Sequence, residues 1–158
     1  MTPAQLTTLK NDIIADPTLN AKPNNSDGAL DIANAYNLNA SPNFTVWKTA
    51  VPIVEVGQKF NGSELAGLTT ANNTRLQTIA LYLDVVNPSI PDNRQFFDDV
   101  FSGAGGVNTR AALLALWKRL ATRGEKLYAT GTGSDPSPAT MTFEGPVSPA
   151  DVTAARNS

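Results

Sequence analysis

Hydrophobic residues recur at helical spacing along most of the chain, and this pattern predicts a mainly α protein. Stop signals divide the pattern into separate helices, because a proline disfavours helical backbone in the residue before it and glycine favours helix ends. One of these helices carries an aromatic stripe that is typical of a core, Phe96, Phe97, Val100 and Phe101. The predicted helices lie at about residues 3–16, 27–36, 71–86, 90–102, 109–129 and 149–155.

Polar residues at the expected helix starts predict how each helix is capped. Three capping boxes are expected, in which a Ser or Thr and a residue three positions later bond each other's backbone. The predicted boxes are Thr2 with Gln5, Ser89 with Asp92, and Ser148 with Asp151, while Ser26 or Asp27 caps the second helix and Asn108 caps the long helix.

Gly124 stands inside the long predicted helix of residues 109–129, where glycine costs about 1 kcal/mol relative to alanine. Either the helix bends at this glycine or another backbone approaches it closely, and we expect the close contact.

Two stretches break the helical pattern. Residues 40–60 carry β-branched and aromatic residues between prolines, which predicts an extended segment or an edge strand. Residues 130–147 are rich in Gly, Pro, Ser and Thr and predict a long extended arm that ends in the short terminal helix. The expected fold is a single, helical bundle-like domain, with a body at residues 1–129 and an arm at residues 130–158.

The composition narrows the chemistry. The chain has no cysteine and no histidine, which removes disulfides, thiolate nucleophiles, the usual triad base and the common zinc ligands. We therefore expect no catalytic residues, no cofactor and no metal site. The net charge of -2 argues against a general affinity for nucleic acid or acidic membranes. Charged residues make up only 16%, against about 25% in typical domains, which favours a surface that neighbouring subunits cover.

Aromatic and basic residues supply the candidate contacts. Trp117 lies on an apolar helix face and is expected in the core, whereas Trp47 is either a lid over the core or an interface anchor. Basic residues at positions 119, 123 and 126 share one face of the long predicted helix, as a solvated surface or as an interface. The predicted interface residues are Phe44, Trp47, Arg119, Arg123, Lys126, Thr130, Thr132, Met141 and Phe143.

Two alternative functions stay open at this point. One is a nucleic-acid-binding accessory protein that uses the basic helix at residues 109–126. The other is a carboxylate-based cell-wall hydrolase, for which Glu125 and Glu144 are the best candidates. The adjacent acids Asp98 and Asp99 point in different directions on a helix and do not form a natural pair.

Three stretches resemble a family of small, poorly characterised virion structural proteins of tailed bacteriophages and prophages. They are PNNSDGALDIANAYN (Pro23 to Asn37), SPNFTVWKT (Ser41 to Thr49) and KLYATGTGSDPSPATMTFEGPVSPADVTAAR (Lys126 to Arg156). The resemblance implies a non-enzymatic component in a connector or neck, tail or capsid-decorating position. Its partners would be other virion proteins and copies of itself in a symmetric assembly.

The start of the chain shows no signal peptide, and no stretch is apolar enough for a transmembrane segment. We therefore expect synthesis in the host cytoplasm followed by incorporation into the virion, with no membrane partner. In this interpretation a helical body fills a site in the assembly, and the extended segments lock it to its neighbours.

Overall fold

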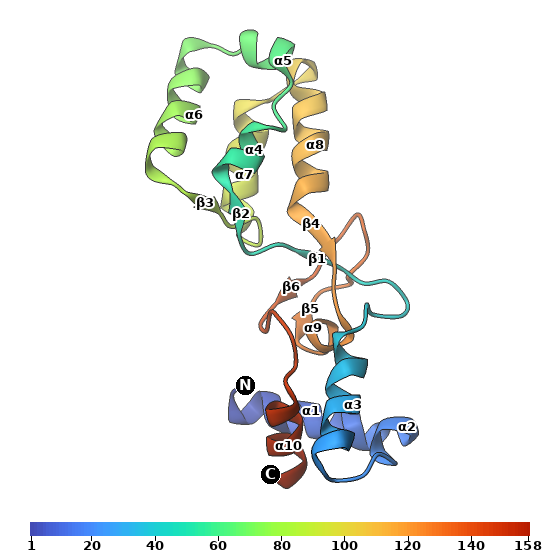
Figure 1. Cartoon of the computed structure of the whole chain (residues 1–158). Helices are drawn as coiled ribbons and strands as arrows, with labels where there is room; N and C mark the ends of the chain where they lie inside the picture. Colours follow the sequence, from blue (N-terminus) through green and yellow to red (C-terminus); the bar gives the residue numbers. More distant parts are fainter. The chain divides into compact units, whose positions relative to one another are not determined.

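The computed structural model describes residues 1–158 and divides the chain into two compact units. Unit 1 combines Met1–Val46 with Leu120–Ser158, and unit 2 is Trp47–Arg119 (Figure 1). Helices hold 57% of the residues and strands 11%, so the prediction of a mainly α chain is confirmed. A single helical bundle is not confirmed, because the chain divides into two units. The chain crosses from one unit to the other at residues 46–47 and 119–120. No helix has the length and apolar character that crossing a membrane requires.

Unit 1 is built mainly from helices at the two ends of the sequence. The capping boxes predicted at Thr2 and at Ser148 are both present. The second long helix is capped by Asn25, whose side chain accepts from the Gly28 N–H, one position before the predicted cap. The elements are α1 (Pro3–Ala15), α2 (Pro17–Asn20), α3 (Ser26–Asn37), α9 (Arg123–Leu127), β5 (Ala129–Thr130), β6 (Thr140–Met141) and α10 (Pro149–Asn157).

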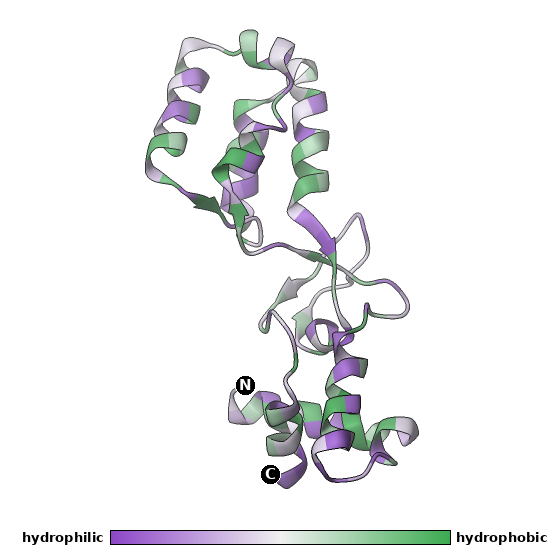
Figure 2. Cartoon of the chain, viewed as in Figure 1, coloured by the Kyte–Doolittle hydropathy of each residue, from purple (hydrophilic) through white to green (hydrophobic).

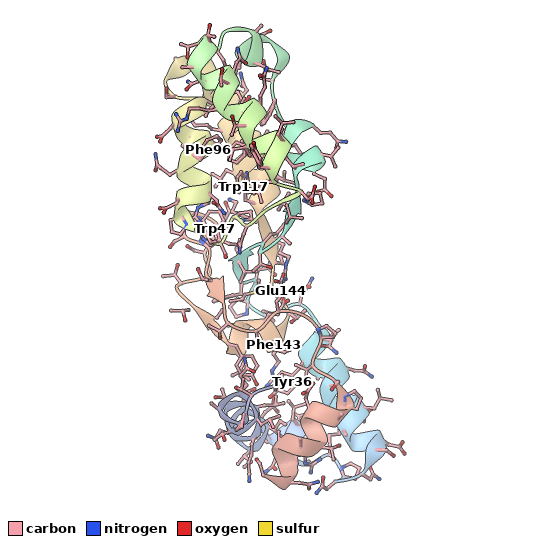
Figure 3. All side chains as sticks on the ribbon, turned by 90° about the vertical axis from the view of Figure 1, so that its left-hand side faces the viewer. Tyr36, Trp47, Phe96, Trp117, Phe143 and Glu144 are labelled. Carbon is pink, nitrogen blue, oxygen red and sulfur yellow. The ribbon has the colours of Figure 1, made fainter.

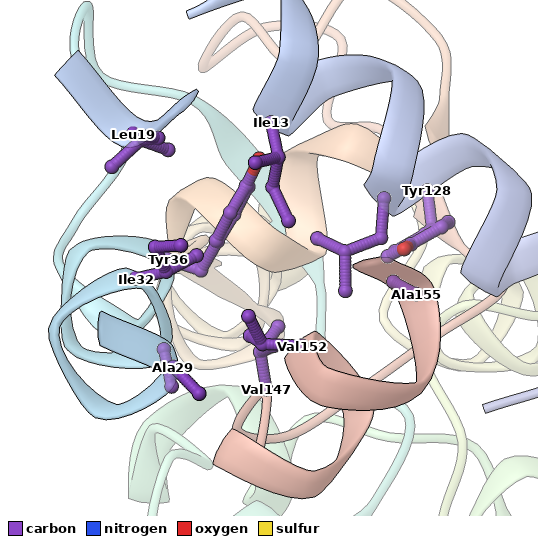
Figure 4. Packing of buried hydrophobic residues seen from close by; sticks show 11 residues of the cluster. Ile13, Leu19, Ala29, Ile32, Tyr36, Tyr128, Val147, Val152 and Ala155 are labelled. Carbon is purple, nitrogen blue, oxygen red and sulfur yellow. The ribbon is translucent and has the colours of Figure 1, made fainter. Parts of the chain in front are cut away.

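The core of unit 1 lies where α10 packs against α1 and α3 (Figure 4). Apolar side chains from both ends of the chain are buried there, which removes their surface from water at roughly 25 cal/mol per Å². The buried residues are Leu9, Ile13, Leu19, Ala29, Ile32, Ala33, Tyr36, Tyr128, Val147, Val152 and Ala155.

The predicted arm at residues 130–147 packs on unit 1 and does not extend away from it. Strands β5 and β6 pair antiparallel, with Ala129 opposite Met141. The Thr45 N–H donates to the Gly133 carbonyl at 2.7 Å, and the Ala139 N–H donates to the Thr45 carbonyl at 2.9 Å. Ala139 and Met141 are buried, so hydrogen bonds and apolar burial hold this segment within its own chain.

The long helix predicted at residues 109–129 is interrupted. Helix α8 (Val107–Trp117) ends at Lys118, whose backbone is extended, and strand β4 (Lys118–Leu120) follows and pairs with β1 (Thr45–Trp47). A capping box between Thr122 and Glu125 then starts α9. The apolar pattern continues through the break because Trp117 of α8, Ala121 after β4 and Tyr128 at the end of α9 are all buried.

Unit 2 contains five α-helices around an aromatic core. Phe97, Val100 and Phe101 of the predicted aromatic stripe are buried with Leu113 and Trp117, which confirms the stripe as core. The stretch predicted as extended at residues 40–60 forms β1 and β2 but then turns into α4. The elements are β2 (Val51–Pro52), α4 (Ile53–Gly57), α5 (Gly62–Ala66), α6 (Thr70–Tyr82), β3 (Val85–Val86), α7 (Pro91–Val100), η1 (Ala104–Gly106) and α8.

The sequence predicted that Asn108 caps α8. A carboxylate from another helix caps it instead. Glu64 of α5 accepts from the Asn108 N–H at 2.9 Å and from the Thr109 N–H at 2.8 Å. Burial of Glu64 opposes its ionisation, but the hydrogen bonds from Thr109 and Asn108 outweigh this and lower its pKa to about 2. The box predicted at Ser89 is also absent, because Ile90 precedes α7 and Ser89 bonds Asn87 instead.

A close approach at Gly124 is confirmed, but the closest atom belongs to a side chain, while the neighbouring backbone is in ordinary contact. A Cβ atom built on Gly124 would lie 2.7 Å from the Val147 Cγ2 atom and 3.4 Å from the Tyr36 carbonyl oxygen. Glycine therefore allows α9 to contact α3 and the segment that leads into α10.

We expect Gly124→Ala to lower the free energy of unfolding by about 1–3 kcal/mol, because the added methyl overpacks a tight contact. Urea unfolding followed by circular dichroism measures the change. Gly62→Ala is the matched control, since its added Cβ meets nothing within 4 Å. An equal stability of the two variants would contradict the close packing at Gly124.

We expect Glu64→Gln to lower the melting temperature by several degrees at neutral pH. The pKa of Glu64 falls from an ordinary 4.5 to about 2 on folding, so its ionised form stabilises the native state above pH 4.5. That contribution is lost as the pH falls from about 4.5 to about 2, and the two proteins should converge over this window. Thermal melts across it, with Glu55→Gln of the exposed α4 surface as control, check this, and a constant difference would refute it.

Candidate protein-binding surface

Unit 2 exposes several large apolar side chains at the end of α6 and around the neighbouring β2–β3 pair. Leu81 and Tyr82 are the most exposed, at 80% and 81% of their surface. Figure 2 colours β3 and the adjoining end of α6 in the green of apolar residues. Contiguous apolar patches of this kind are rare on monomers and mark binding sites. We call this group the α6–β3 patch, and its members are Val54, Leu81, Tyr82, Leu83 and Val85.

Backbone pairing holds the α6–β3 patch together. Strands β2 and β3 are antiparallel, with Val51 opposite Val86 and Pro52 opposite Val85. The Ile53 N–H donates to the Asp84 carbonyl at 2.9 Å, which brings the start of α4 beside the end of α6. Because side chains alternate along a strand, Val86 is buried while its neighbour Val85 faces outward.

A cavity of about 220 Å³ lies next to the patch, between α6, β3 and α7. Leu83 belongs to both the patch and the cavity wall, so the apolar surface continues inward toward the core. Arg75 stacks on the Phe96 ring, with its guanidinium carbon 5.1 Å from the ring centroid (Figure 3). The lining residues are Ile79, Leu83, Val86, Asp92, Asn93, Phe96 and Phe97.

The charges nearest the patch in sequence are negative. Glu55 follows Val54 on α4, and Asp84 stands between Leu83 and Val85. Both acidic residues are exposed. An apolar centre with an acidic rim fits a partner surface that is apolar and carries a positive charge at its edge.

The predicted basic stripe does not lie on one helix. Arg119 belongs to β4, whereas Arg123 and Lys126 belong to α9. Lys126 places its ammonium 5.5 Å from the centroid of the Phe44 ring. The nucleic-acid alternative depended on a continuous basic helix over residues 109–126, and the structure interrupts that helix.

Arg123 is the centre of an ion-pair cluster within unit 1. Its Nη1 donates to Asp16 at 2.9 Å and its Nη2 donates to Asp12 at 3.0 Å, while the guanidinium carbon lies 4.8 Å from the Tyr36 centroid. The Tyr36 hydroxyl donates to the same Asp12 oxygen at 2.5 Å. Hydrogen bonds from Arg123 and from the Leu19 N–H lower the pKa of Asp16. Burial, with the hydrogen bond to Asp12, raises the pKa of Tyr36.

This cluster borders a cavity of about 710 Å³, which Asn39, Ser41 and Lys126 also line. The two carboxylates already bind Arg123; Asp12 belongs to α1, and Asp16 stands between α1 and α2. The arrangement therefore links α1, α3 and α9, which is a stabilising role.

The remaining predicted interface residues have varied surroundings. Met141 is buried, which leaves little of its side chain for a partner, and Phe143 packs edge-on against Tyr128 with centroids 5.3 Å apart. Thr130 and Thr132 are exposed. Phe44 contacts Gly133, where a Cβ atom would lie 2.1 Å from the ring.

Trp47 lies against the core of unit 2. Its ring carries the Arg94 guanidinium, whose central carbon is 4.0 Å from the ring centroid, and Trp47 packs on the buried cluster that includes Trp117. Figure 3 labels both tryptophans in this unit. Trp47 packs on this core and remains partly exposed, which fits both a lid over the core and an interface anchor.

The two predicted acidic candidates, Glu125 and Glu144, differ in exposure, since Glu144 is exposed. Glu125 is buried, and its carboxylate accepts from the Thr122 N–H at 2.9 Å and the Gly145 N–H at 3.1 Å. Asp99 accepts from Gln95 at 2.7 Å on the same helix, one turn away. No group of three or more acidic side chains gathers in a way that would hold a metal ion.

Sequence reasoning missed the α6–β3 patch, although a signal was present. On α6 the core face is Leu76 and Ile79, followed by Leu83. At helical spacing Leu81 and Tyr82 do not lie on that face. Two large apolar residues outside the core face indicate a second apolar surface.

No protein family model, curated protein or solved structure matches this chain.

We expect Arg123→Lys to lower the free energy of unfolding by about 1 kcal/mol, because a lysine is a point charge that cannot bridge two carboxylates and stack on a ring. Chemical denaturation measures the loss. A double-mutant cycle with Asp12→Asn tests the cause, since the penalty of the lysine should shrink when one carboxylate is already neutral. Full additivity of the two substitutions would show that the cluster does not couple them.

Proposed function

We propose that the chain is a non-enzymatic structural component of a tailed-bacteriophage virion, in a connector, tail or capsid-decorating position. It binds neighbouring virion subunits, and the α6–β3 patch is the surface through which it does so. The observation that carries this proposal is the exposure of Leu81 and Tyr82 together with the apolar residues around them. The three stretches that resemble virion proteins support the virion as the setting.

Apolar surface that stays exposed to water costs free energy, which burial on a partner recovers. Aromatic and leucine side chains that a partner covers contribute much of the affinity of protein interfaces, and truncation of a hot-spot residue costs 2 kcal/mol or more. Burial of the patch on a neighbour would therefore stabilise the assembly directly. The C-terminal segment, by contrast, packs within unit 1 and does not extend away from it to bind a neighbour.

The first test is whether the chain is part of the particle. A tagged copy is expressed during growth of the bacteriophage or prophage that encodes it, and particles are purified on a density gradient. Mass spectrometry should find the chain among the particle proteins in a constant ratio to them. Absence of the chain from purified particles would refute the proposal.

The second test concerns the patch. Leu81→Asp should reduce the incorporated amount more than tenfold, because a charge replaces a central apolar contact. Ile14→Asp is a matched control: Leu81 and Ile14 each stand next to the last residue of a 13-residue helix, and Ile14 is also exposed. Wild-type incorporation of both variants would show that the patch is not the binding surface.

A further inference from the structure

Helix α8 carries a second apolar surface on unit 2, distinct from the α6–β3 patch. Val107, Ala111 and Leu114 are exposed and follow one another at i, i+4 and i+7, so they form one stripe along the helix. Arg110 lies on the same side of α8, three residues after Val107 and four before Leu114. We call this group the α8 face.

The α8 face borders a hollow of about 470 Å³, which Asp98, Ser102, Gly103, Val107, Arg110, Ala111 and Leu114 line. The hollow therefore offers apolar walls, one cation and one carboxylate. Arg110 is held in place because its Nη1 donates to the Gly103 carbonyl at 2.9 Å and also to the Phe101 carbonyl.

The two surfaces lie on different sides of unit 2. In Figure 1, α6 and α8 stand at opposite edges of this unit, with α4 and α7 between them. Figure 3, turned by 90°, agrees, because α6 is drawn in front and α8 behind. One copy therefore presents a protruding apolar group on one side and a hollow with apolar walls on the other.

The chemistry of the two surfaces is complementary. The α6–β3 patch has an acidic rim of Glu55 and Asp84, whereas the α8 face carries Arg110. Leu81 and Tyr82 protrude with four-fifths of their surface exposed. The Tyr82 hydroxyl is a donor, and the Asp98 carboxylate in the hollow is an acceptor.

We propose that the partner of the α6–β3 patch is the α8 face of a second copy of this chain. Leu81 and Tyr82 of one copy insert into the hollow on α8 of the next, and Asp84 approaches Arg110. Such an interface joins two different surfaces, so it is head-to-tail and repeats from copy to copy into a ring or a filament. This inference rests on the proposed function, since it names one of the neighbouring subunits.

The experiment uses two full-length variants, each of which removes one surface. Tyr82→Asp disrupts the patch and leaves the α8 face intact, while Leu114→Asp, at a side chain that is 48% exposed, does the reverse. Sedimentation velocity is recorded for the wild type, for each variant and for their equimolar mixture. Circular dichroism and tryptophan fluorescence establish that the variants keep the wild-type fold.

The wild type should form species larger than a dimer as its concentration rises. Each variant alone should be monomeric, because every contact between identical copies needs both surfaces. The mixture should form a one-to-one heterodimer and nothing larger, because exactly one intact patch can meet one intact α8 face. Ile14→Asp should assemble like the wild type.

Other outcomes overturn the inference. A mixture that stays monomeric, or a Leu114→Asp variant that still assembles alone, would show that the patch does not bind α8. A wild type that is monomeric up to about 1 mM would also refute it. If Leu81→Asp still failed to enter particles in that case, the proposed function would stand with a different virion protein as partner. If the mixture forms the heterodimer but the chain is absent from particles, the inference stands and the proposed function is refuted.

Discussion

The packing of α10 against α1 and α3 is the interaction on which the rest of the structure depends, because it joins two segments that are far apart in the sequence. Unit 1 is closed only when residues after 120 return to the first 46. Val147 and Val152 are fully buried in that contact, and the Asn37 side chain bonds both the N–H and the carbonyl of Val147, at 2.8 Å and 3.0 Å. The Asn37 side chain thus satisfies the backbone N–H and carbonyl of Val147, which lies in no strand.

Unit 2 is inserted into unit 1 without opposing this closure, because each unit holds together the two points at which the chain passes between the units. In unit 1 the Ala121 N–H donates to the Phe44 carbonyl at 2.8 Å. In unit 2 the Lys48 N–H donates to the Trp117 carbonyl, also at 2.8 Å. A folded unit with adjacent ends adds little to the entropy of closing the outer unit, since the loop behaves as a short connection rather than a long flexible chain.

The sequence predicted local structure well and long-range pairing poorly, for physical reasons. The capping boxes at Thr2 and Ser148 depend on residues three positions apart, and both exist. The cap of α8 comes instead from Glu64, more than 40 positions earlier, which no local pattern reveals. The break after Trp117 was hidden because Trp117 of α8, Ala121 after β4 and Leu127 of α9 continue one helical period while packing in different clusters.

Because local patterns do not reveal long-range contacts, the sequence predicted a binding surface on the arm, whereas the structure exposes apolar residues on unit 2. Glycine and proline in residues 130–147 indicated a segment without regular structure, and most of it lacks helix or strand. Composition carries no information about hydrogen bonds to Thr45 or burial of Ala139, which hold the segment on its own unit. Unit 1 thus uses its C-terminal segment for its own stability, and a side chain that is already buried cannot also tie a neighbour. Unit 2 leaves apolar side chains uncovered on α6 and α8, on helices whose inner faces already complete a core, and these are the surfaces that we propose for assembly.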